Sequence, residues 1–294
     1  MPTNKGVPTN KKASQNAKAS AKVRAAQQQK RQRLQWSIGI VALVVVGIVV
    51  LVLAKMSTSD SGNTAKPQHT PKPAPASVTS DLAAVPLTAI AAAAKSGVST
   101  NPVKPISGGK PRTANGKPEV LYMGGEFCPY CAGERWALTV ALSKFGTFKN
   151  LQVVHSAESD VPTLTYLGSD YTSKYLTFTP KEIKGNEPKG RSWVDLEKAT
   201  DEQMKLLSEL GGGSFPFIDF GGKYFQSGGS VDVTTLLGKS QTEIAAALAA
   251  STTKDTSQSS LEGNVNLVAG EFIRTICGLT DNQPANVCKA FPQA

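Results

Sequence analysis

Histidine is nearly absent from this chain, which has two among 294 residues. Because His is the side chain that most often ligates metals, this scarcity disfavours His-rich metal chemistry, and we expect neither a metal nor a cofactor. Acidic residues are absent from residues 1–34, which carry nine Lys and Arg side chains. The net charge of +10 therefore belongs to this tail, and the rest of the chain is nearly neutral. This distribution disfavours a nucleic-acid partner.

Charged residues are missing from Trp36 to Ala54, a run of 19 residues that reads WSIGIVALVVVGIVVLVLA. A helix of that length is about 28 Å long, close to the thickness of the hydrocarbon core, and the run lacks the polar stripe of a soluble helix. The sequence therefore predicts a transmembrane helix over residues 35–55. A cleaved signal peptide is the alternative, but the 34 residues in front are too many for a leader.

The basic residues before this helix determine its expected orientation. Lys30, Arg31 and Arg33 lie directly ahead of it, and the positive-inside rule keeps such a flank in the cytoplasm. Residues 1–34 are expected to be a disordered cytoplasmic tail, because their composition cannot bury a core. The chain is then a single-pass protein of the cell membrane, with its C-terminal part outside the cytoplasm.

Two segments follow the predicted membrane helix. Residues 56–84 are rich in Ser, Thr, Pro and Lys, which is typical of an extended stalk. Residues 85–294 contain no internal repeat and are long enough for one domain with a sizeable core. We expect them to form the extracytoplasmic folded domain.

Two of the four cysteines form a CxxC motif. Glu119–Met123 is a short apolar run, typical of a buried strand, and Cys128-Pro129-Tyr130-Cys131 follows it. Apolar residues then recur at helical spacing, and Leu151–His155 is expected to be the next strand. A CxxC motif that opens a helix directly after a strand indicates the start of a thioredoxin-like α/β fold.

This placement gives the two cysteines different expected roles. A thiolate is the attacking species, and the free N–H groups at a helix N-terminus stabilise it. Cys128 at the cap is therefore the expected nucleophile, and Cys131, one turn deeper, is the expected resolving thiol. Pro129 suits the first helical position, where its missing N–H would have no partner. Phe127, Pro129 and Tyr130 are expected to border the substrate.

Other interpretations of the cysteines stay open. A zinc site would need a second closely spaced pair, whereas Cys277 and Cys288 are distant in sequence from the CxxC motif and from each other. A cysteine hydrolase would need His155 beside Cys128, and nothing in the sequence positions it there. An inert bridge between Cys128 and Cys131 is the strongest alternative, because disulfides persist outside the cytoplasm.

A second motif, SFPFIDFGGKYF at residues 214–225, is typical of a β-hairpin. Its two strand-like runs flank Gly221-Gly222, a pair suited to a tight turn. Pro216 stands at the start of the first run, where a proline is tolerated at a sheet edge or in a cis peptide bond.

The segment GKPEVLYMGGEFCPYCAGERWALTVALSKFGTFKNL resembles a family of membrane-anchored, thioredoxin-like proteins of unassigned function. More distantly, it resembles the periplasmic disulfide oxidoreductases, and the resemblance covers roughly residues 85–294. It implies a thioredoxin fold, a redox-active pair at Cys128 and Cys131, and a cis-proline at Pro216 that faces the pair. Phe215 would then present its backbone to an extended substrate.

The chain departs from these relatives around the motif. Tyr122 stands where they bury a carboxylate, six residues before the first Cys. The nearest acid, Glu126, either raises the thiol pKa by repulsion or is simply solvated. Phe215 replaces the Thr or Val that is frequent before the cis-proline.

A long insertion, residues 156–213, separates the two motifs. It contains a strand-like run at residues 171–178 and an expected helix at residues 201–210, for which Thr200 and Gln203 form a capping box.

The C-terminal part is expected to be mainly helical. Ser240 and Glu243 cap one helix, and residues 261–276 form the last long one. Cys277 and Cys288 then follow, and a bridge between them would staple the C-terminal turn. A second redox pair that relays electrons is the alternative.

These features predict a membrane-anchored, extracytoplasmic thiol-disulfide oxidoreductase that acts on cysteines of exported proteins. A membrane quinone-linked oxidase is the expected redox partner. Two alternatives stay open: a thiol reductase for cytochrome maturation, and a noncatalytic assembly or scaffold factor of a membrane complex.

Overall fold

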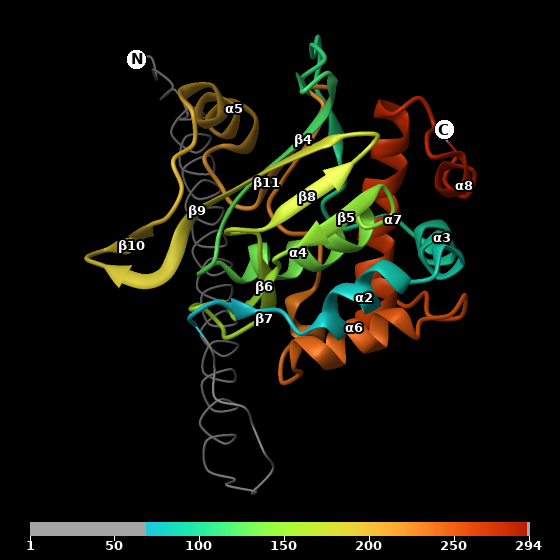
Figure 1. The fold of residues 1–294 in the computed structure, drawn as a ribbon, viewed down its shortest axis with the longest axis horizontal. Coiled ribbons are helices and arrows are strands. Elements are labelled where there is room, and N and C mark those ends of the chain that lie inside the picture. The colour runs from blue at the N-terminus through green and yellow to red at the C-terminus, as the bar shows by residue number, and fades with distance from the viewer. Residues whose placement is uncertain (1–68, 293–294) are drawn as a thin grey trace, which may run out of the picture. The chain divides into compact units, whose positions relative to one another are not determined.

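The computed structural model describes residues 69–292 (Figure 1). This part of the chain mixes strands and helices, so the expected α/β class is confirmed. The predicted tail, the predicted transmembrane helix and the first part of the predicted stalk lie outside the described residues.

The described part contains seven α-helices and one short 3-10 helix. Their bounds are α2 (Ala76–Ala84), α3 (Leu87–Ser96), α4 (Pro129–Leu142), α5 (Asp201–Gly211), η1 (Val233–Thr235), α6 (Gln241–Ala249), α7 (Leu261–Leu279) and α8 (Ala285–Cys288). Between residues 69 and 292, no single helix is long and apolar enough to cross a membrane. In the same range, α2 and α3 taken together pass by length and composition, but a bend of 62° separates them.

The main sheet is built around β4 (Lys117–Gly125), with β9 (Thr177–Lys189) on one side and β11 (Phe217–Phe220) on the other. β9 runs parallel to β4, whereas β11 runs antiparallel to it. The strand order is β10-β9-β4-β11-β12-β2, and β3 also pairs with β4. The remaining strands of this sheet are β2 (Lys104–Pro105), β3 (Thr113–Ala114), β10 (Ser192–Asp195) and β12 (Tyr224–Ser227).

Successive residues of β4 point to opposite faces of the sheet. Val120 and Tyr122 belong to a large hydrophobic cluster that includes buried side chains of α4 and α7. Leu121 and Met123 belong to a smaller cluster with Leu207 of α5. The sheet is therefore a middle layer, with α4 and α7 on one face and α5 on the other.

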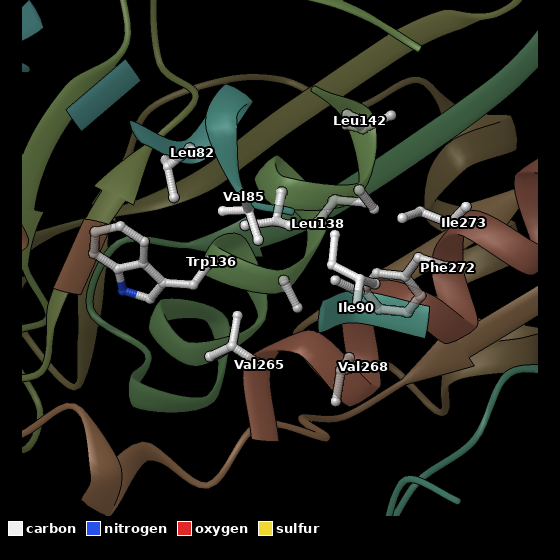
Figure 2. Close-up of a cluster of buried hydrophobic side chains, with 14 of the residues drawn as sticks. Leu82, Val85, Ile90, Trp136, Leu138, Leu142, Val265, Val268, Phe272 and Ile273 are labelled. Carbon is white, nitrogen blue, oxygen red and sulfur yellow. The ribbon is translucent and has the colours of Figure 1, made fainter. Parts of the chain in front are cut away.

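The large cluster is the main core of the described part. Figure 2 shows side chains of α3, α4 and α7 meeting there, with Trp136 of α4 near its edge. Trp136 is fully buried, and its Nε1 donates a hydrogen bond to the carbonyl of Pro162 at 3.0 Å. The buried side chains labelled in this view are Leu82, Val85, Ile90, Trp136, Leu138, Leu142, Val265, Val268, Phe272 and Ile273.

The strand expected at Leu151–His155 is present as β6 (Gln152–His155), but it does not join the main sheet. It pairs with β1 (Lys72–Pro73) and β7 (Pro162–Thr165) in a separate three-stranded sheet. The parallel neighbour of β4 is instead β9, which lies inside the predicted insertion. β9 contains few apolar residues and two prolines, so its sequence gives little sign that both of its edges are paired.

The predicted strand at residues 171–178 is divided between two elements. Its first part belongs to β8 (Asp170–Ser173), which pairs with β5 (Gly146–Lys149) in a small two-stranded sheet. Its end begins β9.

The end of the predicted stalk, residues 56–84, differs from the expectation of an extended spacer. Residues 72–84 contain β1 and α2, and α2 packs against α6. Val78 and Leu82 of α2 are fully buried. These two side chains are spaced by one helical turn, so a Ser-, Thr- and Ala-rich segment still has an apolar face to bury. The folded part therefore begins before residue 85.

Local signals in the second half are confirmed. Thr200 and Gln203 form both hydrogen bonds of a capping box at the start of α5, and Ser240 and Glu243 do the same for α6. The hairpin is present as β11 and β12, joined through Gly221-Gly222.

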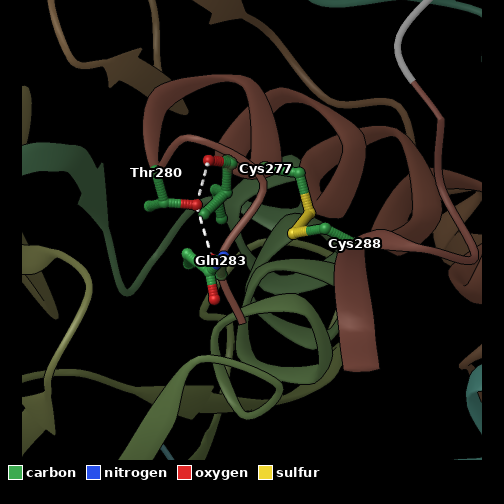
Figure 3. The surroundings of a disulfide bond; sticks show 5 residues. Cys277, Thr280, Gln283 and Cys288 are labelled. Atoms are coloured by element: carbon green, nitrogen blue, oxygen red, sulfur yellow. Dashed lines mark hydrogen bonds between the residues drawn. A yellow bond between two sulfur atoms is a disulfide. The ribbon is translucent and has the colours of Figure 1, made fainter. Parts of the chain in front are cut away.

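The C-terminal turn contains the expected disulfide between Cys277 and Cys288 (Figure 3). The same turn is held by the Thr280 hydroxyl, which hydrogen bonds to the carbonyls of Ile276 and Gln283. Both cysteines are buried.

Candidate active site

Cys128 lies at the N-cap of α4, directly after the loop that ends β4. Its Sγ accepts a hydrogen bond from the backbone N–H of Cys131 at 3.4 Å. Pro129 occupies the first turn, as the sequence predicts. Cys128 is 7% exposed, and Cys131 is fully buried. Both are free thiols in this structure, so the inert bridge is not present here.

The two thiols differ in acidity. The hydrogen bond from the Cys131 side chain lowers the pKa of Cys128 to about 7, and the Cys131 backbone N–H and the Arg135 charge act in the same direction. Burial opposes this shift. For Cys131, burial is the largest effect and raises its pKa well above the ordinary value, with a further rise from Cys128. The arrangement therefore favours Cys128 as the thiolate.

We expect iodoacetamide to label Cys128 before Cys131 in the reduced full-length protein at pH near 6. The rate at Cys128 should rise with pH to a plateau above a midpoint of about 7, because only the thiolate reacts. Peptide mass mapping after short labelling times measures both rates. Faster labelling of Cys131 would contradict the assignment of the nucleophile.

Aromatic side chains flank the motif. Phe127 is half-buried and stacks on Trp193 of β10, with ring centroids 5.0 Å apart and an interplanar angle of 15°. Tyr130 is 58% exposed. Trp193 was not predicted from the sequence, because it lies in the insertion and reaches the motif only through the pairing of β10 with β9.

Pro216 is buried and follows a cis peptide bond with Phe215, as the resemblance implies. Because Phe217 pairs with Met123, Pro216 lies toward the end of β4 that leads to the CxxC motif. Its carbonyl accepts the N–H of Gly228 at 2.8 Å. Within the described residues, the Phe215 backbone takes part in no hydrogen bond.

Glu126 is not solvated, in contrast to one of the two expectations. It is 2% exposed, and its Oε1 accepts a hydrogen bond from the Thr165 hydroxyl at 2.8 Å. Burial raises the pKa of Glu126 to about 7. The other expectation is that Glu126 raises the pKa of Cys128 by repulsion. The main influences on that pKa come from Cys131, burial, Arg135 and Tyr130, and the net shift is downward.

Tyr122 is fully buried, and its hydroxyl has no hydrogen-bond partner in the described part of the chain. Burial raises its pKa well above the ordinary value. The Arg135 guanidinium carbon lies 5.8 Å from the centre of the Tyr122 ring. Arg135 and its partner Glu182 were not predicted as site residues. Arg135 lies in a helix that is otherwise mainly apolar, and Glu182 lies in a segment with the composition of a charged loop.

The zinc and hydrolase interpretations find no support. Among residues 69–292, no group of three or more His, Cys, Asp or Glu side chains is placed to hold a metal ion. The His155 ring contacts Asp160, with 2.9 Å between Nδ1 and Oδ1.

Residues 107–199 match a family described as a domain of unknown function (DUF929). The matched segment contains Cys128, Cys131, Arg135, Glu182 and Trp193, but not Pro216. The comparisons with curated proteins and with solved structures found no match.

Proposed function

We propose that this protein is a membrane-anchored thiol-disulfide oxidoreductase with a thioredoxin-like fold, acting on cysteines of exported proteins. The observation that carries the proposal is the pairing of an acidic thiol at a helix N-terminus, Cys128, with a buried thiol one turn inside, Cys131.

The order of the central strands supports the fold assignment. In β9-β4-β11-β12, only the β4 and β9 pair is parallel, and the CxxC helix directly follows β4. The segment with Pro216 leads into β11, beside β4. These features support the thioredoxin-like fold that the resemblance implies.

The oxidising cycle would use only these two cysteines and the substrate. A substrate thiolate attacks Cys128 Sγ of the oxidised pair, a mixed disulfide forms, and Cys131 leaves as a thiolate that takes up a proton. A second substrate thiolate then attacks the substrate sulfur of the mixed disulfide and releases the Cys128 thiolate. Two electrons pass from the substrate to the pair, and the substrate gains one disulfide. A membrane quinone-linked oxidase would reoxidise the pair.

The Phe215 backbone supports binding of an extended substrate. Its N–H and C=O groups are unpaired within the described residues, so a substrate strand can pair with them. Phe127 and Tyr130 offer apolar contacts on either side of Cys128 in the sequence. Unpaired backbone groups and nearby apolar side chains suit unfolded segments with exposed cysteines.

Oxidation of a reduced test protein measures the proposed activity. The oxidised full-length protein in detergent should convert test-protein thiols to disulfides, with one Cys128–Cys131 disulfide consumed for each one formed. Cys128→Ser should lower the rate by at least about 10³-fold, because serine cannot supply the exchanging sulfur. Unchanged function of Cys128→Ser in cells would instead favour the scaffold alternative.

The reverse direction, reduction of apocytochrome disulfides to thiols, is a second candidate, because a nucleophile with a pKa of about 7 serves either direction. The reduction potential separates the two: a value as low as that of thioredoxin favours the reductase.

The proposed topology places the redox site outside the cytoplasm, since the basic tail precedes the apolar run. Protease added to intact cells after removal of the wall should cleave the C-terminal domain. Protection of that domain, with residues 1–34 accessible, would reverse the topology.

A further inference from the structure

A buried ion pair lies next to the CxxC motif. Arg135 follows Cys131 by four residues and Cys128 by seven on α4, so the three side chains lie along one face of the helix. Arg135 donates to Glu182 of β9 through Nε and Nη2, at 2.8 and 2.7 Å. Both side chains are fully buried. A forked pair of this kind holds both charges in a fixed geometry.

Arg135 is also linked to the loop before Cys128. Its Nη2 donates to the carbonyl of Gly125 at 2.9 Å, and the same carbonyl accepts the N–H of Cys128 at 3.3 Å. The backbone at Gly125 approaches the Phe127 ring closely. Only glycine allows this approach, because a Cβ atom at this position would lie 2.7 Å from the ring. Movement of Arg135 would therefore move the Cys128 backbone.

Glu182 is held from two further directions. Its Oε1 accepts the backbone N–H of Tyr166 at 3.2 Å, and its own N–H donates to Glu197 at 2.8 Å. Arg135 and Glu182 both influence the pKa values of three other buried groups, which are Tyr122, Glu126 and Tyr166. Both charges of the pair therefore have fixed positions in a region from which water is largely excluded, where charges act over longer distances than in solvent.

We propose that the Arg135–Glu182 pair sets the reduction potential of the Cys128–Cys131 pair, with Arg135 favouring the thiolate form and Glu182 opposing it. This inference rests on the proposed redox function. Arg135 contacts neither sulfur through a hydrogen bond and acts through its charge and through Gly125, so it is a positioning residue. Stabilising the thiolate stabilises the reduced protein and makes the disulfide a stronger oxidant.

Single variants of the two partners should shift the potential in opposite directions. Arg135→Met should raise the ionisation midpoint of Cys128 by about one pH unit and make the disulfide less oxidising. Glu182→Gln should lower that midpoint and make the disulfide more oxidising. Each change should alter the equilibrium constant with a glutathione buffer by about tenfold, which corresponds to about 30 mV. The variant Arg135→Met/Glu182→Met should lie between them.

The measurement uses full-length protein in detergent, with thiolate absorbance against pH and alkylation after equilibration with glutathione. Lys181→Met is the matched control. Lys181 precedes Glu182 in the sequence, is partly exposed and pairs with Glu197. Removing its charge should leave the reduction potential unchanged. If Arg135→Met does not fold by circular dichroism, Glu182→Gln alone decides the sign.

The outcomes separate this inference from the proposed function. Equal potentials in the variants and the parent, or shifts of the same sign in both single variants, would overturn the role of the ion pair while leaving the oxidoreductase intact. Failure of the parent protein to exchange with glutathione would overturn both.

Discussion

Replacing Cys131 with alanine is expected to convert short-lived complexes into stable mixed disulfides between Cys128 and substrate proteins. In this variant the complexes form when the Cys128 thiolate attacks a disulfide of a substrate protein and one substrate sulfur leaves as a thiolate. Among the described residues, Cys131 is the only neighbouring thiol placed to displace the substrate again, so its loss leaves the complex in place. Non-reducing electrophoresis of cells that express Cys131→Ala should show new high-mass bands that vanish on reduction. Mass spectrometry of these bands would identify the substrates.

The converse variant is the matched control. Cys128→Ala leaves only the buried thiol, whose pKa burial raises well above the ordinary value, so it should trap little. The double variant Cys128→Ala/Cys131→Ala should trap nothing. Equal trapping by both single variants would contradict the division of roles between the two cysteines.

Replacing Trp136 with alanine is expected to destabilise the domain by about 3–5 kcal/mol, because it removes the largest fully buried side chain from the main core. The change also leaves the Pro162 carbonyl without its indole donor. Urea unfolding followed by circular dichroism measures the free energy of unfolding.

Val98→Ala serves as the control for this experiment. Val98 is 71% exposed, so its truncation should change the free energy of unfolding by no more than about 0.5 kcal/mol. A small effect of Trp136→Ala, comparable with that of Val98→Ala, would show that the core does not depend on α4 as described.

Local features of the sequence predicted much of the fold. The CxxC motif at the start of α4 and the capping boxes of α5 and α6 depend on residues within one helical turn of each other, so their spacing is sufficient. The hairpin at Gly221-Gly222 is local in the same sense. Such signals determine individual elements well.

Contacts between distant segments were harder to predict. β9 was missed as the parallel neighbour of β4 because β6 comes first in the chain and is more apolar. For the same reason the sequence did not bring Glu182 to Arg135 or Trp193 to Phe127. In each case the pairing of β9 determines the contact, and no spacing rule relates the partners.

In the candidate site, too, local motifs could be predicted from the sequence, whereas contacts between distant segments could not. Cys128, Cys131 and Pro216 could be named from short motifs, but the buried surroundings of Glu126 could not, because Thr165 comes from β7 in a different sheet. Burial of a carboxyl group depends on which elements cover it, and the sequence around Glu126 is compatible with a solvated loop.

Equilibration of the full-length protein with a series of glutathione buffers tests the central claim most directly. Alkylation of the remaining thiols and mass analysis at each potential report the state of Cys128 and Cys131. We predict one reversible two-electron transition in which both thiols disappear together, while Cys277 and Cys288 stay bridged throughout. Two thiols that remain reduced in every buffer, or independent glutathionylation of each, would contradict a redox role for the CxxC motif.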